Sequence, residues 1–105
     1  MNAPVCTRSE VIDRLQGAEA LIRGLGVRRL ALFGSFARSE PRADSDVDVL
    51  VEFSPGQKSF DRFMSLCDLL EELLSRRVEV VTTEALSPYI GPHILAEAQD
   101  VVRAA

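Results

Sequence analysis

The chain has 105 residues, of which 47% are hydrophobic and 27% charged, a composition typical of one soluble globular domain. Its 16 acidic and 12 basic side chains give a net charge of −4, which argues against a general nucleic-acid-binding protein with a basic face. The sequence has neither an apolar run long enough for a membrane span nor a basic-then-apolar leader, so we expect a single domain over residues 1–105, located in the cytoplasm.

The chain begins with signals for a helix followed by a buried strand. Thr7 and Glu10 have the Ser/Thr-x-x-Glu spacing of a capping box. Apolar residues then recur every three or four positions, which predicts an amphipathic helix over residues 11–25 that is stopped by Gly24 and Gly26. Residues 30–33 are apolar without alternation, as expected of a strand buried on both faces.

The middle of the chain predicts a short helix, two strands and a second long helix. A turn and short helix over residues 34–40 lead through a loop at 41–44 into a strand at about 46–53. Ser59 is a suitable cap for the next helix. The apolar face of that helix consists of Phe63, Leu66, Cys67, Leu70, Leu73 and Leu74. A third strand is expected at about 77–82.

The end of the chain predicts one more helix. Ser87 and Pro88 offer a cap with proline at the first helical position. Its packing face would consist of Ile94, Leu95, Ala98, Val101 and Val102. The predicted order is therefore helix, strand, short helix, strand, helix, strand, helix. This order indicates a single α/β (α+β) domain in which helices pack on a small mixed sheet.

Two aspartates alternate with valines where the second predicted strand begins. Residues two apart in a strand point to the same face, so Asp46 and Asp48 look out together while the valines face the other way. Neighbouring carboxylates repel and raise each other's pKa, an arrangement that a bridging cation makes favourable. Magnesium is the expected ion, because it binds one or two carboxylates together with waters and substrate phosphates.

A third acid is expected to join this pair. In the strand predicted at 77–82, Glu79 and Val81 point to one face. If that strand lies beside the strand at 46–53, Glu79 sits next to Asp46 and Asp48. We therefore predict that Glu79 is the third acid of the site.

The Gly34-Ser35 turn has the character of a phosphate-binding element. Glycine permits a tight turn after a buried strand and a close approach of a ligand to the backbone. Ser35 is expected to cap the short helix, whose free N–H groups would face an anion. Arg38 adds a positive charge. Together these residues predict a cradle for the polyphosphate of a nucleotide.

These motifs together resemble the signature of a known superfamily. Gly-Ser, ten residues and Asp-x-Asp, in the local forms of residues 34–38 and 45–51, are similar to the motif of the polymerase-beta-like nucleotidyltransferases. The chain resembles the small stand-alone members, the minimal nucleotidyltransferases, over nearly all of its length. It departs from their usual pattern at two positions, with Ser39 in place of glycine and Glu79 in place of a third aspartate.

The resemblance implies an activity. A minimal nucleotidyltransferase would transfer a nucleoside monophosphate, most often AMP from ATP, to a hydroxyl with the help of two Mg2+ ions, and release pyrophosphate. The catalytic and metal-binding residues would be Asp46, Asp48 and Glu79, and the nucleotide-binding residues would be Gly34, Ser35 and Arg38.

The resemblance also implies a partner and leaves alternatives open. Minimal nucleotidyltransferases resemble antitoxins that modify a tyrosine of a HEPN-type ribonuclease toxin, so a protein partner is expected rather than direct nucleic-acid binding. A homo- or hetero-oligomer is compatible with the sequence. Ser39 and Glu79 keep open a non-catalytic module that masks its partner by contact. A small-molecule adenylyltransferase is the other alternative.

Overall fold

The computed structural model describes residues 3–39, 45–89 and 91–103, so the loop predicted at 41–44 lies outside the described residues. Within these ranges the elements in chain order are α1 (Arg8–Gly17), α2 (Glu19–Gly24), β1 (Val27–Phe33), α3 (Gly34–Ala37), β2 (Val47–Phe53), α4 (Phe60–Leu74), β3 (Val78–Thr82), the 3-10 helix η1 (Thr83–Ala85), α5 (Gly91–Glu97) and β4 (Gln99–Arg103). The predicted fold class, helices on a small mixed sheet, is confirmed.

The sheet has the strand order β3-β2-β1-β4. β1 pairs antiparallel with both β2 and β4, whereas β2 and β3 are parallel. The parallel pair needs a crossover connection, and α4 supplies it. Because β2 is central, its acidic residues have a neighbouring strand on either side.

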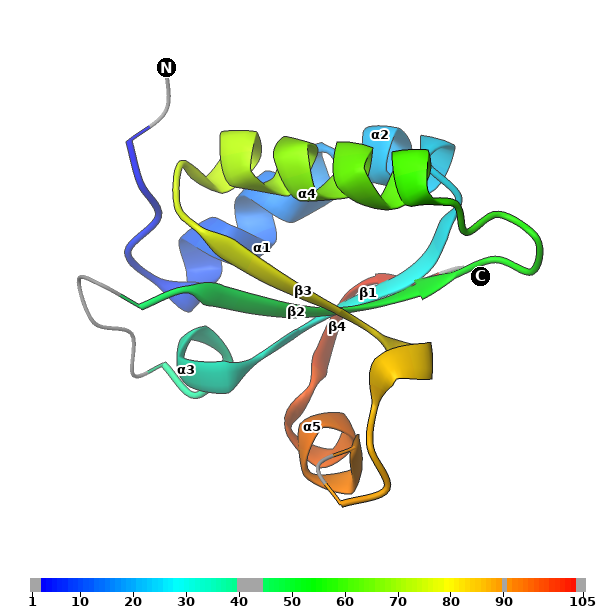
Figure 1. The fold of residues 1–105 in the computed structure, drawn as a ribbon. Coiled ribbons are helices and arrows are strands. Elements are labelled where there is room, and N and C mark those ends of the chain that lie inside the picture. Colours follow the sequence, from blue (N-terminus) through cyan, green and yellow to red (C-terminus); the bar gives the residue numbers. More distant parts are fainter. Residues whose placement is uncertain (1–2, 40–44, 90, 104–105) are drawn as a thin grey trace.

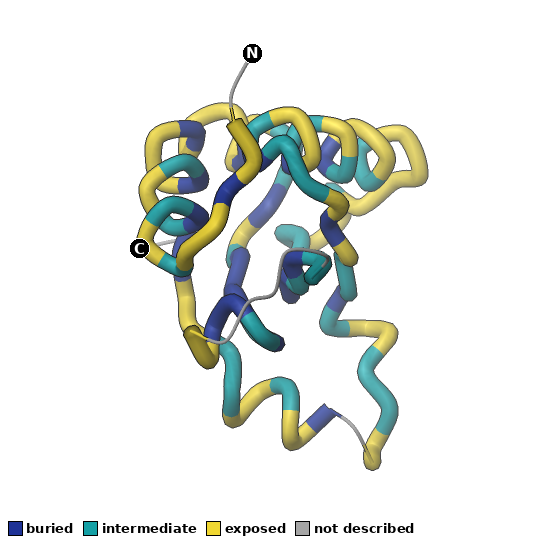
Figure 2. Tube along the Cα trace, turned by 90° about the vertical axis from the view of Figure 1, so that its left-hand side faces the viewer, coloured by how far each residue is buried: buried dark blue, intermediate teal, exposed yellow. Residues whose placement is uncertain are grey.

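Helices lie on both sides of this sheet (Figure 1). α1, α2 and α4 cover one face, while α3 and α5 lie on the other. Burial follows this division: the segment that contains α5 is mostly exposed or half-buried, and the buried residues concentrate around the sheet and the larger helix layer (Figure 2). Within the described parts of the chain, every helix is too short or too polar to span a lipid bilayer.

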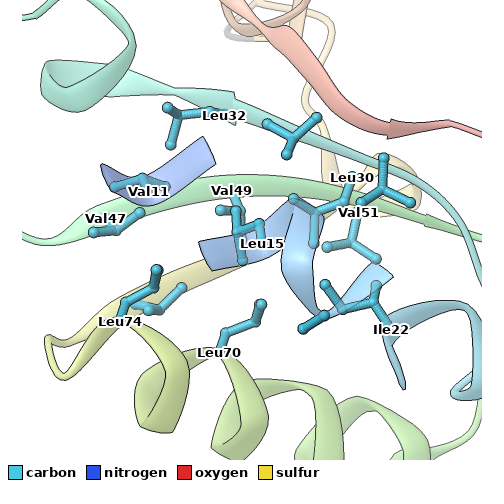
Figure 3. Close-up of a cluster of buried hydrophobic side chains, with 14 of the residues drawn as sticks. Val11, Leu15, Ile22, Leu30, Leu32, Val47, Val49, Val51, Leu70 and Leu74 are labelled. Atoms are coloured by element: carbon cyan, nitrogen blue, oxygen red, sulfur yellow. The ribbon is translucent and has the colours of Figure 1, made fainter. Parts of the chain in front are cut away.

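The core fills the space between the sheet and the helices α1 and α4 (Figure 3). Val47, Val49 and Val51 of β2 are fully buried there, as the period-two pattern predicts. Their burial anchors β2 and sends Asp48 to the opposite face, because successive side chains of a strand alternate. The branched side chains of β2 therefore fix the direction in which the acid points.

The N-terminal caps predicted at Thr7 and Ser59 are confirmed. The Glu10 backbone N–H donates to Thr7 Oγ1 at 3.2 Å, and Glu10 Oε1 accepts from the Cys6 N–H at 3.0 Å. The Arg62 N–H donates to the Ser59 hydroxyl oxygen at 3.2 Å, which opens α4. In both cases a side-chain oxygen satisfies a backbone donor that has no partner within the helix.

The helix predicted over 11–25 is interrupted, which corrects the prediction of one continuous helix. α1 ends at Gly17 and α2 begins at Glu19, with Ala18 between them at φ −110° and ψ 17°. The Ala18 N–H donates to the Leu15 carbonyl at 3.1 Å, a tightened last turn beside a glycine that favours helix weakly. β1 then begins at Val27, three residues earlier than predicted.

The final segment is not the single helix that its apolar spacing predicts. The helix α5 begins at Gly91, not at Ser87 and Pro88, and ends at Glu97; residues 99–103 form the strand β4. The physical reason is the edge of β1, whose backbone groups β4 pairs. Val101 and Val102 are buried in this strand rather than on a helix.

Candidate active site

Asp48 lies at the centre of the candidate site because both neighbouring strands bring partners to it. In the antiparallel pairing with β1 it is opposite Phe33, the residue before Gly34. In the parallel pairing with β3 it is opposite Glu79. Adjacent strands are only about 4.8 Å apart, so both the bend after β1 and the acid of β3 reach Asp48. The predicted placement of Glu79 beside Asp48 is confirmed, whereas its catalytic role stays a prediction.

The surroundings of Asp48 disfavour its charged form. Partial burial, followed by a hydrogen bond with the Glu79 carboxyl and the negative charges of Glu79 and Asp46, raises the pKa of Asp48 from 3.8 to about 6. The positive charge of Arg38 acts in the opposite direction. Without a cation, Asp48 therefore keeps its proton to a higher pH than an ordinary aspartate, as expected of a partly buried carboxyl group beside other acids.

Gly34 brings the bend against Asp48. Its φ of +76° lies in the left-handed region, and a Cβ added there would lie 2.1 Å from Asp48 Oδ2. No side chain fits at this distance, so the position needs glycine both for its backbone conformation and for space. The prediction that the Gly-Ser bend faces the acids is confirmed by this contact.

Ser35 does not have the role predicted from the sequence, and Ser39 departs from the usual family pattern. Ser35 is half-buried and follows Gly34 as the second residue of α3, while the cap position belongs to Phe33, with no side-chain cap bond. The predicted capping role of Ser35 is therefore wrong, because the helix begins one residue earlier. Ser39 has φ 59°, a conformation that glycine adopts more readily than serine. The chain keeps the bend despite this departure.

Arg38 lies at the C-terminal end of α3 and faces two groups of acids. Its guanidinium pairs with the Glu97 carboxylate at the end of α5, and its charge lowers the pKa of Asp48. The Arg38 side chain is 52% exposed. An exposed guanidinium beside the bend is suited to an anionic ligand, because its donors match phosphate oxygens.

The donor set suits a hard divalent cation. Asp48 and Glu79 present carboxylate oxygens side by side, and Asp46 adds its charge from the residue before β2. Magnesium usually takes one or two protein carboxylates and completes its shell with water and substrate phosphates, so the Asp48–Glu79 pair fits it. Within residues 3–39, 45–89 and 91–103, no three His, Cys, Asp or Glu side chains gather closely enough to hold a metal ion together. The three-acid metal site therefore stays a prediction.

The sequence did not predict a role for Arg76, which contacts two segments next to the site. Its guanidinium donates to the Ser45 carbonyl at 3.1 Å and to the Val5 carbonyl at 3.0 Å. The same group lies 5.4 Å from the centre of the buried Phe36 ring of α3, a cation–π distance. Arg76 thus ties the segment that enters β2 to the short helix of the bend. Nothing in the sequence around Arg76 signals this role, because its partners are distant in the chain.

A cavity of about 450 Å3 lies away from these acids. It is lined by Lys58, Ser59, Phe60, Phe63 and Thr82, at the start of α4 and the end of β3. Glu79 is near the opposite end of β3, so this mostly apolar hollow does not include the predicted site residues. The candidate site is therefore defined by its charged groups and the Gly34 contact rather than by a deep cavity.

The sequence matches known nucleotidyltransferases. Residues 16–101 match the family model described as nucleotidyltransferase domain. A protein of Methanocaldococcus jannaschii, provisionally named a protein adenylyltransferase, is 43% identical over 77 residues, which cover 73% of this chain and 82% of that protein. The protein adenylyltransferase MntA of Thermococcus cleftensis is 42% identical over 72 residues, which cover 69% of this chain and 72% of that protein.

The fold matches solved structures as well. A structure provisionally described as a minimal nucleotidyltransferase superposes with a TM-score of 0.81 at 33% identity, over 92% of this chain and 98% of that one. A complex of tri-AMPylated Shewanella oneidensis HEPN toxin with MNT antitoxin gives a TM-score of 0.56 at 18% identity, over 85% and 72% of the two chains, a likeness of fold alone. The chain therefore belongs to the nucleotidyltransferase family of enzymes and, within it, to the minimal nucleotidyltransferases.

Proposed function

We propose that this chain transfers AMP from ATP to a hydroxyl of a protein partner, a tyrosine of a HEPN-type toxin, and so acts as an antitoxin. The observation that carries the proposal is the contact of the Gly34 bend with the Asp48–Glu79 pair, which sets a phosphate-binding turn beside paired carboxylates. The names of the relatives as protein adenylyltransferases support the reaction type. The Shewanella oneidensis complex, named for an AMPylated HEPN toxin, supports the partner class.

In the proposed reaction, the acceptor hydroxyl oxygen forms a bond to the α-phosphorus of ATP. The bond between this phosphorus and the oxygen that bridges the α and β phosphates breaks. Pyrophosphate leaves, and the hydroxyl proton is taken up at the Asp48–Glu79 pair. When bound, two Mg2+ ions would stabilise the negative charge on the attacking and leaving oxygens, as metal ions do in other phosphoryl-transfer enzymes.

The residues of the chain divide this work between them. Asp46 and Asp48 would hold the metal, with Glu79 as the third acid. Gly34 and Ser35 would receive the β and γ phosphates along the backbone, and the Arg38 guanidinium would neutralise their charge. In this proposal the partner itself presents the acceptor hydroxyl.

The experiment that tests the proposal uses ATP labelled at either the α or the γ phosphate. The purified chain is incubated with Mg2+, labelled ATP and the product of the adjacent gene as the candidate partner. Adenylyl transfer predicts label on the partner from α-labelled ATP and none from γ-labelled ATP. Label from the γ position would instead indicate phosphoryl transfer and contradict the proposal.

The same incubation separates the two alternatives. A stable complex of the chain with its partner, formed without any label, would favour masking by contact, the reading that Ser39 and Glu79 left open. Label on neither protein, together with consumption of ATP when small hydroxyl compounds are added, would favour a small-molecule transferase. Either result would replace the protein-modification proposal.

A further inference from the structure

The junction between α5 and β4 contacts the short helix α3 in two places. The Glu97 carboxylate pairs with the Arg38 guanidinium. Two residues later, the Gln99 side-chain amide donates to the Ala37 carbonyl at 3.4 Å. The two residues in contact are 59 positions apart in the first case and 62 positions apart in the second. The end of α3, which carries the positive charge of Arg38, is therefore held by the segment at the junction of α5 and β4.

The charges around Arg38 indicate what its ion pair with Glu97 does. Arg38 pairs with Glu97, and its charge also lowers the pKa of Asp48. Asp46 and Glu79 add negative charge near Asp48. A long arginine side chain that is 52% exposed has many rotamers, and the ion pair with Glu97 restricts them. A guanidinium that is already restricted loses less conformational entropy when it binds a ligand.

We propose that Glu97 is a positioning residue for nucleotide binding: it holds the Arg38 guanidinium at the end of α3, the short helix that follows the Gly34 bend, and so prepares it to bind a triphosphate. This inference rests on the proposed function for the identity of the ligand. A guanidinium carries five N–H donors, so an ion pair with one carboxylate oxygen is compatible with donation to phosphate oxygens. The Glu97 side chain is 27% exposed, which limits screening of this pair by solvent relative to a fully exposed one.

A double-mutant cycle on ATP affinity tests the proposal. The variants are Glu97→Gln, Arg38→Ala and the two together, each titrated with ATP and Mg2+ in a calorimeter. We expect Glu97→Gln to weaken ATP binding about three- to tenfold, the range for one partly exposed charged hydrogen bond. In the Arg38→Ala background the same change should have no further effect, because Glu97 acts only through Arg38. An equal loss in both backgrounds, or no loss in either, would overturn the proposal.

Three controls separate positioning from a structural role. Glu84→Gln removes another ion-paired carboxylate, the partner of Lys58 beyond the far end of β3, and should leave ATP affinity unchanged. Glu97→Asp retains the charge on a shorter side chain and should recover part of the affinity lost in Glu97→Gln. The melting temperature of Glu97→Gln should stay close to that of the wild type; if it falls, the Glu97→Asp result decides, and an affinity for ATP no better than that of Glu97→Gln contradicts the proposal.

The assay of AMP transfer distinguishes failure of this inference from failure of the proposed function. Where transfer occurs, Glu97→Gln should raise the KM for ATP with little change in kcat, since Glu97 positions a binding group. A non-additive cycle without any transfer would contradict the proposed reaction and leave the role of Glu97 intact. Transfer with unchanged ATP affinity in Glu97→Gln would contradict the inference alone, and a wild-type chain that binds no ATP would contradict both.

Discussion

Gly34 is the residue on which the geometry of the site most directly depends. Its Cα touches the Asp48 carboxylate so closely that a methyl group would lie 2.1 Å from Oδ2, and its φ is +76°. We therefore expect Gly34→Ala to destabilise the protein by about 3 kcal/mol, from backbone strain together with overpacking. Urea unfolding at neutral pH measures this free energy.

A matched control uses a glycine without these constraints. Gly17 ends α1, and a Cβ there would have no neighbour within 4 Å. Gly17→Ala should be neutral or stabilise the protein by up to about 1 kcal/mol, because alanine favours helix more than glycine. If both alanine variants unfold at the same urea concentration, the close contact between the bend and Asp48 is wrong.

The raised pKa of Asp48 predicts a dependence of stability on pH. Because the folded protein binds the Asp48 proton more tightly than the unfolded chain, stability from this group is present at low pH and is lost as pH rises from about 4 through about 6. Asp48→Asn cannot ionise, so at pH 7.5 in EDTA it should be more stable than the wild type by about 1 kcal/mol, after discounting for solvent screening. Melting temperatures at pH 4 and 7.5 measure the effect.

At pH 4 the difference between the two proteins should be much smaller than at pH 7.5, since Asp48 is then protonated in the folded state and nearly half protonated in the unfolded state. Mg2+ at pH 7.5 should stabilise the wild type more than Asp48→Asn, because the cation needs the carboxylate. A variant that is less stable than the wild type at pH 7.5 in EDTA would mean that burial and the neighbouring acids do not disfavour the charge of Asp48.

Among the elements, local signals predicted what local interactions form. The caps at Thr7 and Ser59 were found from single residues because each bonds a backbone N–H three residues away. The two faces of β2 followed from alternation alone. The strand β4 could not be found in this way. Its residues have the spacing of a helix face, and their pairing with β1 depends on an edge that only the assembled sheet presents.

The strand β4 carries a prediction that a C-terminal helix would not make. Val102 is fully buried in β4, whereas Leu95 of α5 is 47% exposed. Val102→Ala should cost about 2 kcal/mol of stability through the lost apolar contacts, while Leu95→Ala should cost less than about 0.5 kcal/mol. Urea unfolding of the two variants compares them. Similar costs would restore the prediction of one helix with both residues on its packing face.

At the scale of the whole molecule, the site residues that could be predicted from the sequence are those that lie close together in the chain or follow from the pattern of one strand. Asp46, Asp48 and the Gly34 bend were identified from motifs that lie within fifteen residues, and Glu79 followed from the period of one strand. The supporting residues were not identified. Arg76 reaches Ser45, and Glu97 reaches Arg38, only through tertiary packing of segments 31 and 59 residues apart. A sequence pattern without a fold gives no indication of such pairs.

The central claim is that the acid at the start of β2 is needed for AMP transfer and not for the fold or for contact with the partner. Its most direct test compares Asp48→Asn with Glu52→Gln, a matched loss of charge further along β2, on the same face. Both variants are assayed for transfer of α-labelled AMP to the partner and for partner affinity. We predict that Asp48→Asn lowers transfer about a hundredfold or more with unchanged partner affinity, and that Glu52→Gln transfers normally. Transfer by Asp48→Asn at the rate of the wild type would contradict the account.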